Sequence, residues 1–231
     1  MEFTKNIYKA TFISRPNRFN AEVLFNKDKI VVHVPNTGRC REILTPGCTV
    51  LLREEDNPNR KTKFDLIAAY KGDILINIDS QIPNKVVKEA LELENVDKLK
   101  KYNKVLTEKT FGSSRFDFKL SNDENQEYFL EVKGVTLEDN GYCKFPDAPT
   151  ERGKKHIMEL IEAKKHGFGS GILFLIQLDN IKSFTPNNET DPEFSNALKL
   201  ASENGVDIFA YSCKVTETSI TLDKPVDIIL K

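Results

Sequence analysis

The sequence predicts a mixed α/β (α+β) fold in two parts, an all-β part in residues 1–82 and an α/β part in residues 83–231. The first eighty residues contain several short β-type segments and no convincing long helix. From about Asn84 onward, apolar residues at helical spacing alternate with strand-like runs. Because 39% of the residues are hydrophobic and 15 are Phe, both parts can bury a core.

The first part reads as a small β-barrel. Five segments have the composition of strands and are separated by Pro, Gly and Asn turns: residues 21–25, 29–34, 49–53, 64–70 and 74–78. Five short strands of this kind predict a closed or partly open barrel, and an OB-like barrel is the first choice. Such barrels often bind oligonucleotides, although many only support a neighbouring domain.

The second part alternates helices and strands. Asn84 is expected to cap a helix over residues 85 to about 94, and Thr150 a helix that runs to about residue 165. A third helix is expected from Pro192 to about residue 203. Strands are expected at residues 102–107, 113–120, 128–132, 172–178 and 206–215. The alternation is typical of an α/β unit.

One hairpin, residues 114–120 and 128–133, carries the most informative pattern. If Leu120 faces Tyr128, then Phe118 faces Leu130 and Phe116 faces Val132, so a single register aligns every apolar pair. The same register predicts that Asp117 lies directly across from Glu131, with Cβ atoms about 5 Å apart.

Two opposed carboxylates repel each other unless a cation lies between them. Mg²⁺ takes oxygen ligands and keeps sites for water and phosphate oxygens, so Asp117 and Glu131 could hold one. Lys133 projects from the same face and could stabilise charge on a scissile phosphate. The alternative is a solvated charged face in which Lys119 and Lys133 neutralise the two acids. Strand alternation alone does not separate these interpretations.

Several longer motifs resemble the sugar fermentation stimulation protein family over nearly the whole chain. They are Asn17-Arg-Phe19, His33-Val-Pro-Asn-Thr-Gly38, Asp56-Asn-Pro-Asn-Arg60, Gln81-Ile-Pro-Asn84, Ser114-Arg-Phe-Asp117, Glu131-Val-Lys-Gly-Val-Thr-Leu137 and Phe145-Pro-Asp-Ala-Pro-Thr-Glu-Arg-Gly-Lys-Lys-His156. The resemblance implies an OB-like first domain and a second domain of the PD-(D/E)-x-K nuclease fold. It implies that Asp117 and Glu131 bind metal, with Glu89 as an additional acid, and that Asp117, Glu131 and Lys133 form the catalytic set.

Basic and amide side chains in loops are candidates for binding a nucleic-acid backbone, because phosphate recognition needs only accessible donors. The candidates are Arg15, Arg18, Asn36, Thr37, Arg39, Arg60, Arg115, Arg152 and Lys155. Phe12 and Phe19 could stack on bases, but core packing is the favoured interpretation for both. His156 alone does not indicate a metal site or a general base.

The predicted function is a nucleic-acid-binding protein, acting on DNA and possibly RNA, with Mg²⁺- or Mn²⁺-dependent nuclease activity. The alternative is a non-catalytic DNA-binding regulator of sugar (maltose) utilisation genes, which the family name implies. An enzyme of sugar metabolism is not supported, because the chain has no Gly-rich phosphate loop, dinucleotide fingerprint or nucleophile elbow.

Composition sets further expectations. The formal net charge is −1, so any nucleic-acid site must be a local patch. The sequence shows no signal peptide and no membrane-spanning segment, which predicts a cytoplasmic protein. Four widely spaced Cys indicate neither a structural zinc site nor a disulfide framework. A homodimer is possible, because many nucleases of this fold act on two strands.

Overall fold

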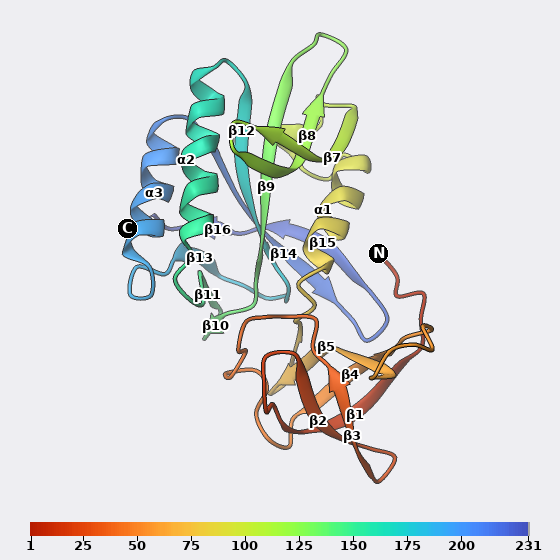
Figure 1. Ribbon diagram of the computed structural model, residues 1–231. Coiled ribbons are helices and arrows are strands. Elements are labelled where there is room, and N and C mark those ends of the chain that lie inside the picture. The colour runs from red at the N-terminus through yellow and green to blue at the C-terminus, as the bar shows by residue number, and fades with distance from the viewer. Residues whose placement is uncertain (231) are drawn as a thin grey trace.

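The computed structural model describes residues 1–230 and places a barrel beside an α/β domain (Figure 1). The barrel strands are β1 (Ile7–Ser14), β2 (Asn20–Phe25), β3 (Asp28–His33), β4 (Thr49–Glu54), β5 (Phe64–Lys71) and β6 (Ile74–Asn77). They lie in the order β3-β2-β1-β4-β5-β6, and an additional pairing of His33 with Asp65 joins β3 to β5. Strands β1 to β5 therefore form a closed barrel, as the sequence predicted.

Strand β1 is the barrel strand that the sequence did not predict. The five predicted segments correspond to β2 through β6, whereas β1 lies between β2 and β4 in the middle of the sheet. Only Ala10 and Phe12 of this strand are buried. Exposed Lys9 and Thr11 interrupt the apolar residues, and the strand obtains its stability from two neighbours rather than from its own composition.

The α/β domain is built on a second six-stranded sheet in the order β15-β14-β12-β9-β8-β7. Its strands are β7 (Lys104–Phe111), β8 (Ser114–Ser121), β9 (Glu127–Val135), β12 (Gly169–Ile176), β14 (Asp207–Val215) and β15 (Ile220–Pro225). The strands β9, β12 and β14 are parallel. A small third sheet contains β10 (Glu138–Asp139), β11 (Tyr142–Phe145), β13 (Ser183–Pro186) and β16 (Asp227–Ile228).

Helices cover both faces of the second sheet. The helices are α1 (Ile82–Glu92), α2 (Glu151–Lys165) and α3 (Pro192–Glu203), with a short 3₁₀ turn η1 (Asp97–Leu99) after α1. Helix α1 packs on one face, and α2 and α3 pack side by side on the other (Figure 1). None of the helices within residues 1–230 is long and apolar enough to cross a membrane. The four Cys are free thiols.

The start of α1 differs from the prediction. The helix begins at Ile82 with Gln81 as its N-cap, so Asn84 is not the cap but lies inside the first turn. Pro83 explains the earlier start, because its fixed φ suits the first turn and its missing N–H is not needed there. Asn84 is thereby free to use its side chain elsewhere. The predicted cap of α2 is confirmed, since the Thr150 hydroxyl accepts a hydrogen bond from the Gly153 N–H.

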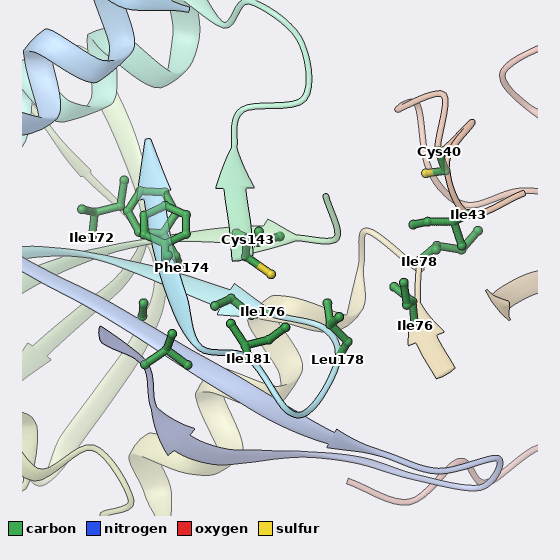
Figure 2. Close-up of a cluster of buried hydrophobic side chains, with 14 of the residues drawn as sticks. Cys40, Ile43, Ile76, Ile78, Cys143, Ile172, Phe174, Ile176, Leu178 and Ile181 are labelled. Carbon is green, nitrogen blue, oxygen red and sulfur yellow. The ribbon is translucent and has the colours of Figure 1, made fainter. Parts of the chain in front are cut away.

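The barrel and the α/β domain share one continuous apolar core. Figure 2 shows Ile176 and Leu178 at the end of β12, with Ile76 and Ile78 of the barrel beyond them, and all four belong to one buried cluster. The buried Gln177 amide donates to the Asn77 side chain at 2.8 Å and to the Asp79 backbone carbonyl at 3.2 Å. These contacts fix the barrel's last strand against the residues that directly follow β12.

The first residues of the chain lie against the second domain as well as the barrel, where Phe3 packs on a cluster that includes Leu51 and Ile67. Glu2 forms a bridge with Ser219, and the Phe3 N–H donates to the Thr218 carbonyl at 2.8 Å. The turn between β14 and β15 therefore holds the segment that leads into β1.

Candidate active site

The candidate site lies where β8 and β9 separate. The paired positions run from Ser121 and Glu127 to Phe118 and Leu130 and then stop. The predicted pairs of Leu120 with Tyr128 and of Phe118 with Leu130 are therefore confirmed. The predicted pairs of Phe116 with Val132 and of Asp117 with Glu131 are wrong, because β9 continues along β12 as far as Val135 and leaves β8 at this point.

The separation also reverses the expected direction of Phe116. Its ring packs at 5.7 Å from Phe129 and 5.9 Å from His156, on the face that α2 covers. Phe118 and Leu120 pack instead in the cluster under α1. The apolar residues of β8 therefore pack on both faces of the sheet. The alternation of side chains along the strand is interrupted between Phe116 and Phe118.

Asp117 is held by two donors at this break. Its Oδ2 accepts a hydrogen bond from the backbone N–H of Val132 at 2.8 Å, and its Oδ1 accepts one from the Asn84 amide at 2.7 Å. The carboxylate thus replaces the missing strand partner of β9. Asn84 can reach Asp117 because it lies in the first turn of α1, beside the same pocket.

Glu131 lies deeper, with only 2% of its surface exposed. Its Oε1 accepts hydrogen bonds from Lys133 Nζ at 2.5 Å and from His156 Nδ1 at 2.6 Å. Arg152 Nε donates to the other ring nitrogen of His156 at 3.4 Å, so the partners place the ring proton on Nδ1. The second carboxylate oxygen, Oε2, is buried and has no hydrogen-bond partner.

The two carboxyl groups have pKa values shifted in opposite directions. Burial and the nearby charge of Glu131 raise the pKa of Asp117, and the bonds from Val132 and Asn84 offset only part of this. Burial also acts to raise the pKa of Glu131, but the hydrogen bond from His156 and the charge of Lys133 outweigh it. The pKa of Glu131 is therefore below its ordinary value. The site carries one firmly ionised acid beside one whose charge is disfavoured.

Asp117, Glu131 and Lys133 line one open pocket of about 290 Å³. Arg152 and Gly153, at the start of α2, and Asn84 of α1 also line it. Within residues 1–230 no group of three or more His, Cys, Asp or Glu side chains is arranged around a common ion position. Any cation here would have two side-chain carboxylates and would need further oxygen ligands from backbone, water or substrate.

The structure does not bring Glu89 to this pocket. Glu89 Oε2 instead pairs with the amino group of Met1 at 2.6 Å, and Glu89 is absent from the pocket lining. On α1 the buried face is formed by residues such as Val86 and Ala90, and Glu89 points to the side of the helix where the chain begins. Asn84, one turn earlier, occupies the place that the sequence analysis gave to Glu89.

The candidate nucleic-acid residues fall into four groups. Arg152 reaches the candidate pocket, and Arg18, Thr37 and Arg39 line a groove on the barrel. Lys155 and Arg115 lie outside both hollows: Lys155 donates to the Ser113 carbonyl at 3.2 Å, and Arg115 lies 3.7 Å from Glu108.

The remaining three candidates are engaged in contacts within the barrel. Arg15 also lines the groove, but its two terminal nitrogens donate to the carbonyls of Arg18, Asn36, Gly38 and Arg39 at 2.6–2.8 Å. The Asn36 amide donates to the Ile78 carbonyl and accepts from the Gly38 N–H. Arg60 is bound to Asp65 at the point of barrel closure.

His156 and Asn84 are the site residues whose roles sequence reasoning did not identify. His156 is one of the buried residues of α2, with Gly153, Ile157 and Leu160. The helical spacing of His156 with these buried residues was the signal in the sequence for its role, because a His on the buried face of a helix needs a polar partner. The partner, Glu131, lies on a different element and could not be read from the helix alone.

The fold and the site together define the class: an OB-like barrel followed by a restriction-endonuclease-like α/β domain, with two carboxylates and a lysine in one pocket. Residues 13–78 match the family profile described as the SfsA N-terminal OB domain. Residues 81–219 match the one described as the sugar fermentation stimulation protein RE domain.

The chain belongs to the sugar fermentation stimulation protein family. It is 65% identical over 230 residues to homologs from Clostridium perfringens (strain SM101 / Type A) and Clostridium tetani (strain Massachusetts / E88), with 100% of each chain covered. The solved structure of Pyrococcus furiosus SfsA, described as a complex with Ca²⁺, has a TM-score of 0.88 at 27% identity, and the match covers 99% of both chains. The family and fold predicted from sequence are confirmed.

The raised pKa of Asp117 leads to a prediction about stability. Because the folded protein disfavours the ionised form, the free energy of unfolding without divalent cations should fall as pH rises through this raised pKa. Asp117→Asn removes the fall, so its free energy of unfolding relative to that of the wild type should increase as pH rises toward 7. Urea denaturation in EDTA between about pH 4 and pH 8 measures the difference.

Asp123→Asn is the matched control. Asp123 is exposed, and the hydrogen bond from Lys104 lowers its pKa. The stability of Asp123→Asn relative to that of the wild type should therefore not increase as pH rises. A stability difference between Asp117→Asn and the wild type that does not change with pH would contradict the raised pKa of Asp117.

Proposed function

We propose that this protein is a Mg²⁺- or Mn²⁺-dependent phosphodiesterase that hydrolyses DNA or RNA. The observation that carries the proposal is the buried Oε2 of Glu131, which has no hydrogen-bond partner. The carboxylate of Asp117 lines the same pocket. An unpaired buried carboxylate oxygen is costly, and an oxygen-binding cation is the simplest partner that would satisfy it.

The residues present fit a hard divalent cation. Asp117 and Glu131 offer oxygen ligands, and the pocket is open enough for water and phosphate oxygens to complete the shell. A bound Mg²⁺ or Mn²⁺ supplies positive charge that stabilises the phosphate oxygens while the ester bond breaks. Binding of Ca²⁺ by the Pyrococcus furiosus relative supports a divalent cation in this family, because Ca²⁺ also takes oxygen ligands.

Two cationic side chains would act on the substrate. Lys133 lies at the pocket with its ammonium on Glu131 Oε1, where it can stabilise charge that develops on the scissile phosphate. Arg152 lies at the start of α2, where backbone N–H groups also favour an anion. Its guanidinium can hold a phosphate by two parallel hydrogen bonds. Hydrolysis then adds water to phosphorus and releases one ester oxygen as a hydroxyl.

Cleavage assays test the proposal directly. Wild-type protein should cut labelled DNA or RNA with Mn²⁺ or Mg²⁺ and not with EDTA. Asp117→Asn and Lys133→Ala should each lower kcat about 100-fold or more, because each removes a group that interacts with the transition state.

Lys119→Ala is the matched control for Lys133→Ala. Lys119 lies on β8, pairs with Glu127 at 2.6 Å and does not line the pocket, so its loss should leave cleavage unchanged. Metal-dependent cutting that survives in Asp117→Asn and Lys133→Ala would place the activity elsewhere. Binding of DNA without cutting of any substrate would favour the regulator instead.

His156 yields a separate prediction, because it fixes the orientation of Glu131 without lining the pocket. His156→Ala should weaken Mn²⁺ binding by about 10–100-fold, the usual effect of losing a residue that orients a metal ligand. Cleavage should return at saturating Mn²⁺. His156→Asn keeps a donor near the Nδ1 position and should restore part of the affinity. Titration calorimetry measures the binding.

His166→Ala serves as the control, because His166 is exposed at the end of α2 and bonds only to the Glu162 carbonyl. Wild-type Mn²⁺ affinity in a folded His156→Ala protein would show that His156 does not position a metal ligand.

A further inference from the structure

Three hollows on the surface, from the barrel to the candidate pocket, are neighbours in series because each shares lining residues with the next. The first is a groove of about 770 Å³ on the barrel, and the second is a cleft of about 180 Å³ between the domains. Thr37 lines both. The cleft then shares Ser80, Pro83 and Gly134 with the catalytic pocket. A chain-like ligand could therefore follow one path from the groove to Glu131.

The groove has the chemistry of a nucleic-acid strand site. Its lining includes Arg15, Arg18, Arg39 and Arg41 and no Asp or Glu. Phe19 also lines it, and 55% of this aromatic residue is exposed. The preference for core packing that the sequence suggested is correct for buried Phe12 and wrong for Phe19. An exposed aromatic ring among arginines is the arrangement on which unpaired bases stack.

Hydrogen bonds and close packing tie the walls of this path together. Arg15 ties the two loops of the groove together through four backbone carbonyls. A Cβ added to Gly38, in the second of these loops, would lie 2.8 Å from Asp147 Oδ2 of the α/β domain, so loop and domain are in close contact. Gln177 and the shared core hold the barrel itself. Polar and apolar contacts thus join the part of the chain that forms the groove to the part that forms the candidate pocket.

Gly134 keeps the junction between cleft and pocket open. A Cβ added there would lie 2.5 Å from Gln177 Oε1 and 2.8 Å from Pro83 Cγ. Any other residue would therefore crowd the point where the two hollows meet. The cleft is also smaller than the roughly 300–1,000 Å³ of small-molecule sites, which favours a passage over a closed ligand pocket.

We propose that the substrate is a single-stranded nucleic acid, or the single-stranded part of a larger one, that stacks a base on Phe19 and passes through the cleft to Glu131 and Lys133. This inference rests on the proposed function and adds the class of substrate. A duplex does not fit the path, because its base faces are stacked on one another and are not available to Phe19. Arg18, Arg39 and Arg41 of the groove contact the phosphates of the same strand, while Arg15 holds the loops.

Binding is tested first, in EDTA, so that the result does not depend on cleavage. The probes are fluorescent single strands of about 20 nucleotides and a hairpin duplex of the same composition, measured by anisotropy at fixed salt. The single strand should bind at least about 10-fold more tightly than the duplex. Phe19→Ala should weaken binding of the single strand about 10-fold, the effect of losing one stacked base.

Three further variants separate stacking from general effects. Phe19→Trp should retain the affinity and Phe19→Leu should lose it, because both are apolar but only Trp has a ring face. Tyr142→Ala is the control: Tyr142 is an aromatic residue with 48% of its surface exposed, and it does not line the groove. Its loss should leave binding unchanged. Phe19 and Tyr142 are both largely exposed, so none of these variants should impair folding.

Cleavage then tests whether groove and pocket hold the same strand. With Mn²⁺, Phe19→Ala should raise KM about 10-fold for strands of about 20 nucleotides and leave kcat unchanged. For strands short enough to occupy the pocket without reaching Phe19, the variant should equal the wild type.

The outcomes separate this inference from the proposed function. Equal binding of strand and duplex, or identical behaviour of Phe19→Ala and Tyr142→Ala, overturns the inference whether or not the protein cuts. Strand binding that depends on Phe19, with no cleavage under any condition, supports the groove as a single-strand site and overturns the nuclease. An equal effect of Phe19→Ala on short and long strands overturns the continuous path.

Discussion

The buried carboxylate of Glu131 is the constraint on which the rest of the site depends. A buried negative charge costs several kcal/mol unless it is paired, so its surroundings must supply donors. His156 and Lys133 satisfy one of its oxygens from α2 and from β9 itself. The other oxygen is left without a donor at the point where β8 and β9 part. The same separation allows Asp117 to approach, since its carboxylate takes the backbone N–H that β8 no longer pairs.

The position of the barrel follows from the same part of the sheet. Strand β12 pairs with β9 along its whole length, and the residues after β12 carry Gln177 and Leu178 into the contact with the barrel. Strand β12, next to the strand that carries Glu131, therefore also anchors the barrel. Because an apolar core and buried hydrogen bonds both cross this interface, the barrel groove keeps a constant position relative to Glu131.

Much of this arrangement could be predicted from the sequence, and the failures have physical causes. Apolar alternation and the caps gave most of the strands and all three helices, as the confirmed cap at Thr150 illustrates. The register of β8 on β9 was correct only up to Phe118, because pairing with β12 draws β9 away and residue spacing does not report that competition. Glu89 lies away from the site, where it pairs with Met1, and the contact of His156 with Glu131 depends on how α2 packs. Exposed Phe19 shows the same limit: composition alone cannot separate a core aromatic from a surface one.

The most direct test of the account is the position of a bound cation. Crystals grown with Mn²⁺ and measured near the manganese absorption edge would locate the ion by its anomalous signal. The account predicts a peak within about 2.0–2.3 Å of Glu131 Oε2 and of an Asp117 carboxylate oxygen, with His156 still on Oε1. A peak at another acidic cluster, such as Glu138 and Asp139, with the catalytic pocket empty at saturating Mn²⁺, would contradict it.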